Sequence, residues 1–166
     1  AAAVSESRRT IARFLGGVEP DEIVFTGCAT ESNNTAVFGS MAANRGRRHI
    51  VISAVEHPSV LEVAREAERR GCELTVVPVD ADGNLDMTAF VKALRPDTLL
   101  VSIMHANNET GVVFPVAELA RIAKETDPSI LFHTDATQSV GKLDVDLTGG
   151  MAHVDMLSFS GHKLHA

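Results

Sequence analysis

Runs of apolar, often β-branched residues alternate along the chain with segments in which apolar residues recur every three or four positions. The apolar runs predict strands, and the periodic segments predict amphipathic helices. The predicted strands are Glu22–Thr26, His49–Ser53, Glu73–Val77, Thr98–Met104, Ile130–Thr134 and Asp155–Ser160. Several of these runs are apolar throughout, as expected for parallel strands that are covered on both faces.

The helical segments fall between these strands. They are Thr30–Asn44, Pro58–Arg70, Thr88–Leu94 and Pro115–Glu125, and another helix is already under way at Ser5. The clearest is Pro58–Arg70, which has an apolar stripe and is followed by Gly71 as a stop signal. The alternation predicts an α/β fold, with a mostly parallel sheet and helices on both faces. No repeat, low-complexity segment or linker divides the 166 residues, so we expect one domain.

Composition excludes several classes of function. A formal net charge of −7 argues against nucleic acid as a partner, and the short basic cluster Arg45–Arg48 is interpreted as a solvated turn. No apolar stretch approaches the roughly 20 residues of a membrane helix, so no membrane partner is expected. Cys28 and Cys72 have neither metal-site spacing nor a disulfide pattern. We therefore expect no metal site and a reducing, cytoplasmic location.

The candidate chemistry lies at the ends of two predicted strands. Asp135 follows the run at 130–132, and Lys163 follows the strand at 155–159. An aspartate and a lysine at the carboxyl ends of neighbouring parallel strands can converge on one ligand. Pyridoxal 5'-phosphate (PLP) requires this pair, because a lysine amine forms its Schiff base and a carboxylate keeps its pyridine nitrogen protonated. Ser160 and His162 are donors suited to its phosphate.

Five motifs resemble, in order and spacing, the cysteine desulfurases of the NifS/IscS type. They are Thr26–Asn34, Glu56–Pro58, Asn107–Gly111, Asp135–Gln138 and Ser158–Lys163. The resemblance implies fold type I of the class V aminotransferases and a PLP cofactor. It also implies L-cysteine as substrate, alanine and an enzyme persulfide as products, an iron–sulfur scaffold protein as sulfur acceptor, and a homodimer. The form of the third motif and Phe114-Pro115 lean toward the nitrogenase-associated branch.

The resemblance also implies roles for individual residues. Ala29 and Thr30 belong to a phosphate cradle at a helix start, although Thr30 is open to reading as an ordinary helix cap. His57 resembles a histidine that stacks on the cofactor ring and takes part in proton transfer, or it is a surface residue that caps a helix. Asn108 positions the cofactor and substrate, or is a turn residue.

Two further roles complete the predicted site. Gln138 resembles a glutamine that hydrogen-bonds the phenolic oxygen of PLP, or it is the third residue of a turn capped by Asp135. Lys163 is implied to hold the cofactor and to remove the Cα proton of the substrate. The catalytic residues predicted from the resemblance are thus Lys163 and His57.

Members of this family are considerably longer than 166 residues. We therefore expect residues 1–166 to form part of the large PLP-binding domain, without the C-terminal small domain and its nucleophilic cysteine. On that expectation the chain alone is inactive as a desulfurase. Two alternatives stay open: another fold type I enzyme, such as a selenocysteine lyase or an aminotransferase relative, and an inactive, truncated interaction module.

Overall fold

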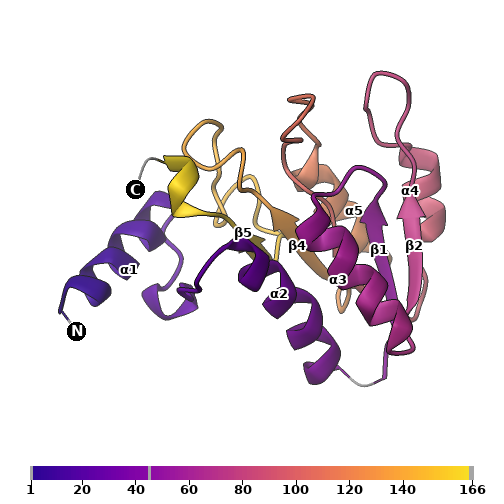
Figure 1. Cartoon of the computed structure of the whole chain (residues 1–166), viewed down its shortest axis with the longest axis horizontal. Helices are drawn as coiled ribbons and strands as arrows, with labels where there is room; N and C mark the ends of the chain where they lie inside the picture. Colours follow the sequence, from indigo (N-terminus) through magenta and orange to yellow (C-terminus); the bar gives the residue numbers. More distant parts are fainter. Residues whose placement is uncertain (1, 45, 165–166) are drawn as a thin grey trace.

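The computed structural model describes residues 2–44 and 46–164. Their five strands form one sheet in the order β2-β1-β3-β4-β5, and every neighbouring pair is parallel (Figure 1). The strands are β1 His49–Ser53, β2 Glu73–Val77, β3 Thr98–Ser102, β4 Leu131–Asp135 and β5 Met156–Ser158. Five of the six predicted strands are therefore present, with bounds that differ by a few residues.

Helices cover both faces of the sheet, as predicted. Helices α2 (Ala29–Ala43) and α3 (Pro58–Arg69) pack on one face, and α4 (Met87–Ala93) and α5 (Val116–Thr126) pack on the other (Figure 1). Helix α1 (Ala2–Phe14) lies beyond the β5 side of the sheet, and two short 3-10 turns, η1 (Pro20–Glu22) and η2 (Gly161–Leu164), complete the fold.

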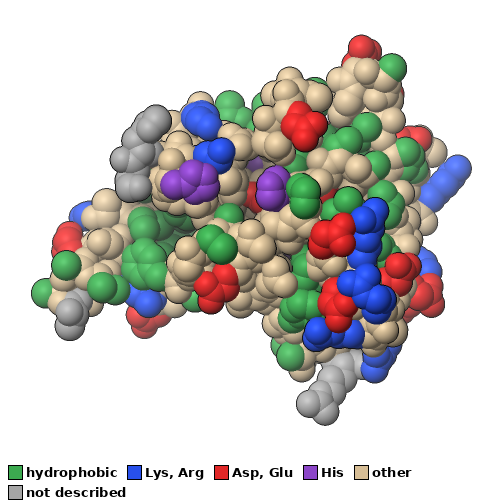
Figure 2. Space-filling view, in the orientation of Figure 1, with side chains coloured by type: hydrophobic (Ala, Val, Ile, Leu, Met, Phe, Trp, Pro, Cys, Tyr) green, Lys and Arg blue, Asp and Glu red, His purple; other side chains and the backbone are tan. Residues whose placement is uncertain are grey.

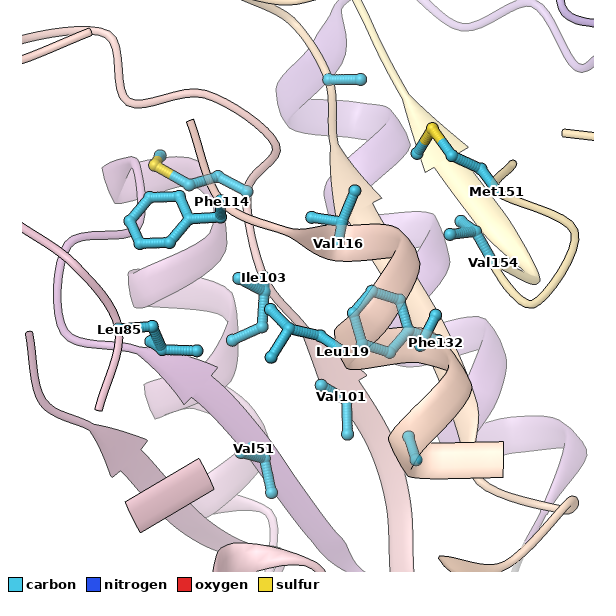
Figure 3. Packing of buried hydrophobic residues seen from close by; sticks show 14 of the residues in the cluster. Val51, Leu85, Val101, Ile103, Phe114, Val116, Leu119, Phe132, Met151 and Val154 are labelled. Carbon is cyan, nitrogen blue, oxygen red and sulfur yellow. The ribbon is translucent and has the colours of Figure 1, made fainter. Parts of the chain in front are cut away.

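The alternation of side chains along each strand produces two apolar cores. Val101 and Phe132 point to the α5 face, where they meet Leu119 (Figure 3). Ile50 and Leu100 point the other way, into a cluster with residues of α2 and α3. All five of these side chains are fully buried, and each such burial contributes about 1.5–3 kcal/mol. Burial on both faces explains why these strands read as continuous apolar runs.

The strand order creates a crevice at one end of the sheet. The chain runs from β1 through α3 to the outer strand β2, and then through α4 back across β1 to β3. The connections that leave β1 and β3 therefore depart in opposite directions. In such sheets ligands bind outside the carboxyl ends of the strands where the order reverses. The segments that follow β1, β3, β4 and β5 are therefore the ones that lie at this crevice.

The prediction of a strand at Glu22–Thr26 is wrong. The 3-10 turn η1 occupies Pro20–Glu22, and residues 23–26 continue as backbone that pairs with no strand among the described residues. Val24 is 70% exposed and Phe25 is 47% exposed, so this segment lacks the burial of the sheet strands. Its β-branched and aromatic residues favour extended backbone, but pairing depends on a partner strand that local sequence does not specify.

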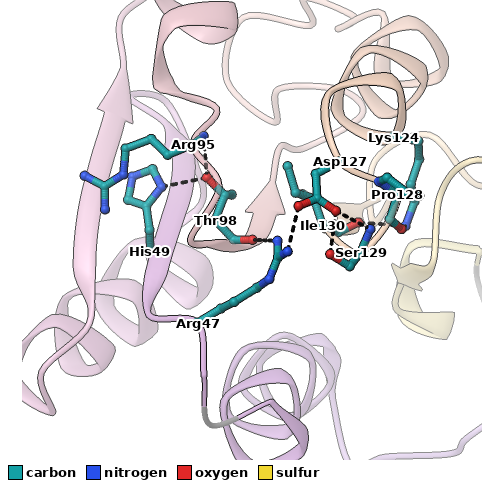
Figure 4. Close-up of polar contacts among 9 residues, drawn as sticks. All are labelled: Arg47, His49, Arg95, Thr98, Lys124, Asp127, Pro128, Ser129 and Ile130. Atoms are coloured by element: carbon teal, nitrogen blue, oxygen red, sulfur yellow. Dashed lines mark hydrogen bonds and ion pairs between the residues drawn. The ribbon is translucent and has the colours of Figure 1, made fainter.

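The basic cluster is only partly a solvated turn. Arg47 donates to the Thr98 carbonyl at 3.0 Å and forms an ion pair with Asp127 at 2.6 Å (Figure 4). Hydrogen bonds from Ser129, followed by the Arg47 guanidinium, lower the pKa of Asp127 below its usual range. Arg47 therefore fastens the entry to β1 onto the turn after α5, and Arg45 lies outside the described residues.

The exposed side of α3 carries alternating acidic and basic side chains (Figure 2). Arg65 pairs with Glu62 at 2.7 Å, and Arg70 pairs with Glu66 at 2.8 Å as its spacing predicts. Such exposed pairs contribute little to stability, typically about 0.2–1 kcal/mol. No helix within residues 2–44 and 46–164 is long and apolar enough to cross a membrane.

Candidate functional site

A cavity of about 320 Å³ opens at the carboxyl ends of β1, β3, β4 and β5 and at the start of α2. This volume is in the range of small-molecule sites, roughly 300–1,000 Å³. The structure brings all nine residues singled out in the sequence to its wall: Ala29, Thr30, His57, Asn108, Asp135, Gln138, Ser160, His162 and Lys163. Cys28, Ser59, Met104, Ala106 and Thr137 line the rest.

Asp135 ends β4 and is the buried carboxylate of the cavity, with 6% of its surface exposed. Its Oδ1 accepts a hydrogen bond from the backbone N–H of Thr137 at 2.9 Å, which shapes the turn that carries Gln138. Its Oδ2 accepts a hydrogen bond from Asn33 Nδ2 at 2.8 Å. The alternative interpretation of Asp135 as a capping residue is thus correct for Oδ1. The other oxygen, Oδ2, is held by Asn33 of α2.

Asn33 and Ser59 connect Asp135 to His57, and sequence reasoning assigned a role to neither. Asn33 Nδ2 also lies 2.8 Å from Ser59 Oγ, and Ser59 Oγ lies 2.8 Å from His57 Nδ1. The backbone N–H of Ser59 donates to the same His57 nitrogen at 3.1 Å. His57 therefore caps α3, as its alternative reading held, and it lines the cavity as well.

Lys163 lies in the turn η2 and is exposed, facing the cavity from the β5 side. Within residues 2–44 and 46–164 its amine forms no hydrogen bond or ion pair, so it is available to a ligand. Ser160 Oγ and His162 Nδ1, the two predicted phosphate donors, lie 2.7 Å apart and hydrogen-bond each other. The turn packs closely on Gly141, where a Cβ would lie 2.5 Å from a methyl carbon of Leu164.

The start of α2 offers unpaired backbone amides to the cavity. The cap residue is Cys28, and its side chain makes no capping hydrogen bond. Because the first turn of a helix leaves its N–H groups without helical partners, those near Ala29 and Thr30 are free to bind an anion. The alternative reading of Thr30 as the capping residue is wrong, since the helix begins one residue earlier at Ala29.

The loop after β3 carries Asn108 to the cavity, and its shape depends on the neighbouring Asn107. Asn107 Oδ1 accepts from the backbone N–H groups of Glu109 and Thr110, both at 2.9 Å. Its Nδ2 donates to the Val55 carbonyl at 3.1 Å and thereby joins this loop to the one that carries His57. Asn107 is thus a buried turn residue, while Asn108 stays exposed.

Glu56 is a third residue to which sequence reasoning assigned no role. It is 6% exposed, and its Oε1 accepts from the Ser53 hydroxyl at 2.6 Å and from the Met104 backbone N–H at 2.9 Å. Its Oε2 has no hydrogen-bond partner among the described residues. Burial, reinforced by the charge of Asp135, raises the pKa of Glu56 to about 8. The only signal in the sequence was a glutamate directly before His57. The burial that gives Glu56 its role cannot be seen in that short motif.

His133 and His49 are structural residues of the sheet. His133 lies between the hydroxyls of Ser102 and Ser158, at 2.8 and 2.9 Å, and burial lowers its pKa to about 4. His49 likewise lies between two hydroxyls, those of Thr98 on β3 (Figure 4) and Thr75 on β2, and burial lowers its pKa too. Neither lines the cavity. In the described part of the chain no group of three or more His, Cys, Asp and Glu side chains could hold a metal ion.

Comparison with known proteins places the chain in a family. The model of the class-V aminotransferase family matches residues 1–166. The chain is 45% identical over 164 residues to Cysteine desulfurase 2 of Trichormus variabilis, covering 99% of this chain and 40% of that protein. It is 42% identical to Cysteine desulfurase NifS of Azotobacter vinelandii, with the same coverage.

A solved structure agrees with these sequence matches. The protein solved as "SspA in complex with cysteine" superposes with a TM-score of 0.91 at 40% identity, covering 99% of this chain and 46% of that one. A five-stranded parallel sheet with a cavity at its carboxyl edge, together with these matches, defines the fold as type I. The chain belongs to the class-V aminotransferase family and is a homologue of the NifS and IscS cysteine desulfurases. It spans about 40% of the length of the curated relatives that it matches.

Proposed function

We propose that the cavity binds PLP, with Lys163 as the covalent attachment point and Asp135 as the partner of the pyridine nitrogen. The observation that carries this proposal is the arrangement of the two residues. A buried carboxylate at the end of β4 and an exposed amine in η2, the turn that follows the neighbouring strand β5, line one cavity, and the amine has no partner among the described residues. When bound, PLP supplies an electron sink for the Cα of an amino acid.

The other lining groups fit the remaining parts of PLP. The amides at the start of α2, the Thr30 hydroxyl and the Ser160–His162 pair form an anion-binding end suited to the phosphate. Gln138 and Asn108 are amide donors suited to the phenolic oxygen and its surroundings. His57 lines the cavity beside them, where its flat ring is suited to stack on that of the cofactor.

We propose further that the whole protein is a cysteine desulfurase. L-Cysteine is the substrate, and Lys163 moves the proton at Cα. A cysteine thiolate of the whole protein attacks the substrate sulfur, the C–S bond breaks to release alanine, and the enzyme persulfide so formed passes its sulfur to an iron–sulfur scaffold protein. Two observations support this proposal. The chain is 42–48% identical to proteins named cysteine desulfurase, and a similar protein, SspA, was solved in complex with cysteine. We also propose that the protein is a cytoplasmic homodimer and that residues 1–166 form part of its large domain. Nitrogenase maturation is the pathway toward which the third motif leans.

Titration with PLP and amino acids tests the proposal. Added PLP is expected to produce an absorbance band near the visible edge in the wild-type chain and in Lys142→Ala, but not in Lys163→Ala. Lys142 is the matched control because it lies near the same cavity, bonded to Gln138, at its exposed edge. L-Cysteine is then expected to change the band at lower concentration than L-alanine does. A band in Lys163→Ala contradicts the cofactor assignment, and a stronger response to L-alanine contradicts the substrate.

A further inference from the structure

The row of hydrogen bonds that runs from Asp135 through Asn33 and Ser59 to His57 has one consistent placement of hydrogens. Asn33 is fully buried, and its Nδ2 has two acceptors at 2.8 Å, Asp135 Oδ2 and Ser59 Oγ. Turning the amide over would set Asn33 Oδ1 against a carboxylate oxygen, acceptor facing acceptor. The amide nitrogen therefore faces Asp135 and donates both of its hydrogens.

This placement determines the direction of the next bond. Because Ser59 Oγ accepts from Asn33, its own hydrogen goes to His57 Nδ1 at 2.8 Å. The Ser59 backbone N–H points at the same nitrogen from 3.1 Å. Two donors converge on Nδ1, so that atom carries no hydrogen, and a neutral imidazole then has its hydrogen on Nε2.

We propose that Asn33, acting through Ser59, is a positioning residue that holds the His57 ring with a bare Nδ1 and its hydrogen on Nε2. The same amide orients the Asp135 carboxylate, so one buried side chain sets both residues. It follows that His57 offers the cavity a hydrogen-bond donor and a flat ring, and not a base. If PLP binds as proposed above, which this consequence assumes, proton removal in the site falls to Lys163.

Nuclear magnetic resonance of the chain labelled with ¹⁵N-histidine tests the inference directly. Two-bond ¹⁵N–¹H correlations show which ring nitrogen bears the hydrogen, and His57→Gln assigns the signal by its loss. The wild-type chain without PLP is expected to show a bare Nδ1 and a protonated Nε2. In Asn33→Asp the Ser59 hydroxyl turns to the new carboxylate, so the population with a bare Nδ1 is expected to fall about twofold or more at neutral pH.

Asn34→Asp is the matched control, because it places the same charge one residue along α2. Among the described residues the Asn34 side chain bonds only to its own helix, through the Thr30 carbonyl. This variant is expected to leave the His57 signal as in the wild type. A hydrogen on Nδ1 in the wild-type chain, or equal spectra for Asn33→Asp and Asn34→Asp, overturns the inference.

Ser59→Ala provides a second variant should Asn33→Asp not fold. It removes the hydroxyl and keeps the backbone N–H, so the His57 Nδ1 resonance is expected to move toward that of a nitrogen with one fewer hydrogen bond. An unmoved resonance overturns the inference. All of these spectra are taken without PLP. Failure of PLP to bind Lys163 therefore leaves them unaffected, and a wrong tautomer leaves the cofactor proposal standing.

Discussion

Glu56 Oε1 accepts a hydrogen bond from the backbone N–H of Met104 at 2.9 Å, which joins the loop after β1 to the end of β3. These are the two strands between which the sheet order reverses. The bond thus fixes the edge of the cavity next to His57. Because the pKa of Glu56 is raised to about 8, chiefly by burial, the carboxyl makes this contact in its neutral form at pH 7.

Replacing Glu56 by Gln is expected to change how stability depends on pH. The unfolded carboxyl ionises near 4.5 and the folded one near 8, so folding takes up a proton between these values. The contribution of Glu56 to the free energy of unfolding therefore falls as pH rises from about 4.5 to about 8, and is constant above that. Gln keeps an oxygen for both hydrogen bonds but does not titrate. Relative to wild type, Glu56→Gln is expected to gain up to a few kcal/mol over this window.

Urea denaturation of both proteins at several pH values between 5 and 8.5 measures this difference. Glu62→Gln serves as control, because Glu62 is an exposed carboxylate on α3 with 61% of its side chain accessible. Curves of stability against pH that stay parallel for wild type and Glu56→Gln would show that Glu56 is ionised in the folded protein.

His133 is expected to make the fold sensitive to acid. Its folded pKa of about 4 lies below the usual 6.5 because the ring is buried, so the neutral ring favours folding above about pH 6.5. That contribution is lost as pH falls from 6.5 through 4. His133→Gln is expected to be less stable at pH 7 by about 1–3 kcal/mol, since the Ser102 and Ser158 hydroxyls lose a partner. The deficit should shrink toward pH 4, as followed by thermal denaturation, whereas exposed His153→Gln should show no such trend.

Gly141 is expected to accept a side chain only at a cost in stability, because η2 packs against it. Its φ of 78° is unfavourable for other residues, and a Cβ would lie 2.5 Å from Leu164. Gly111 has a φ of 76° but open space around it, so Gly111→Ala isolates the backbone cost of about 1 kcal/mol. Gly141→Ala should lose more stability than Gly111→Ala in urea denaturation. Truncating Leu164 to Ala in the same protein should recover the excess, and equal losses for the two glycines would show that η2 does not rest on Gly141.

Local patterns in the sequence were sufficient for most of the fold. Strands β1 to β5 and helices α2 to α5 coincide with predicted segments because apolar periodicity reflects burial, and both faces of the central strands β1, β3 and β4 are buried. The prediction of a strand at Glu22–Thr26 was wrong because local preference is not enough. These residues favour extended backbone, but no described strand pairs with them. Strands β3 and β5 end earlier than predicted. Apolar residues, Ile103 and Met104 after β3 and Phe159 after β5, continue the pattern into the loops.

The candidate site could be predicted only in part. Asp135 and Lys163 were found because a carboxylate and an amine at neighbouring strand ends indicate chemistry by themselves, and the resemblance to a family supplied most of the other lining residues. Asn33 and Glu56 were missed because their roles depend on contacts between distant segments: Asn33 lies 102 positions before the carboxylate that it holds, and Glu56 lies 48 positions before its backbone donor. Such partners become visible only once the strands are placed side by side.

Mapping of the reduced cofactor adduct tests the central claim most directly. The chain is mixed with PLP, treated with borohydride, digested and analysed by mass spectrometry. The account predicts a pyridoxyl group on Lys163, on the peptide that includes Ser160 and His162, and its disappearance in Lys163→Ala while Lys142→Ala retains it. A modification found mainly on Lys142, Lys124 or Lys92, or equal labelling of all lysines, would contradict the assignment of this cavity as a PLP site.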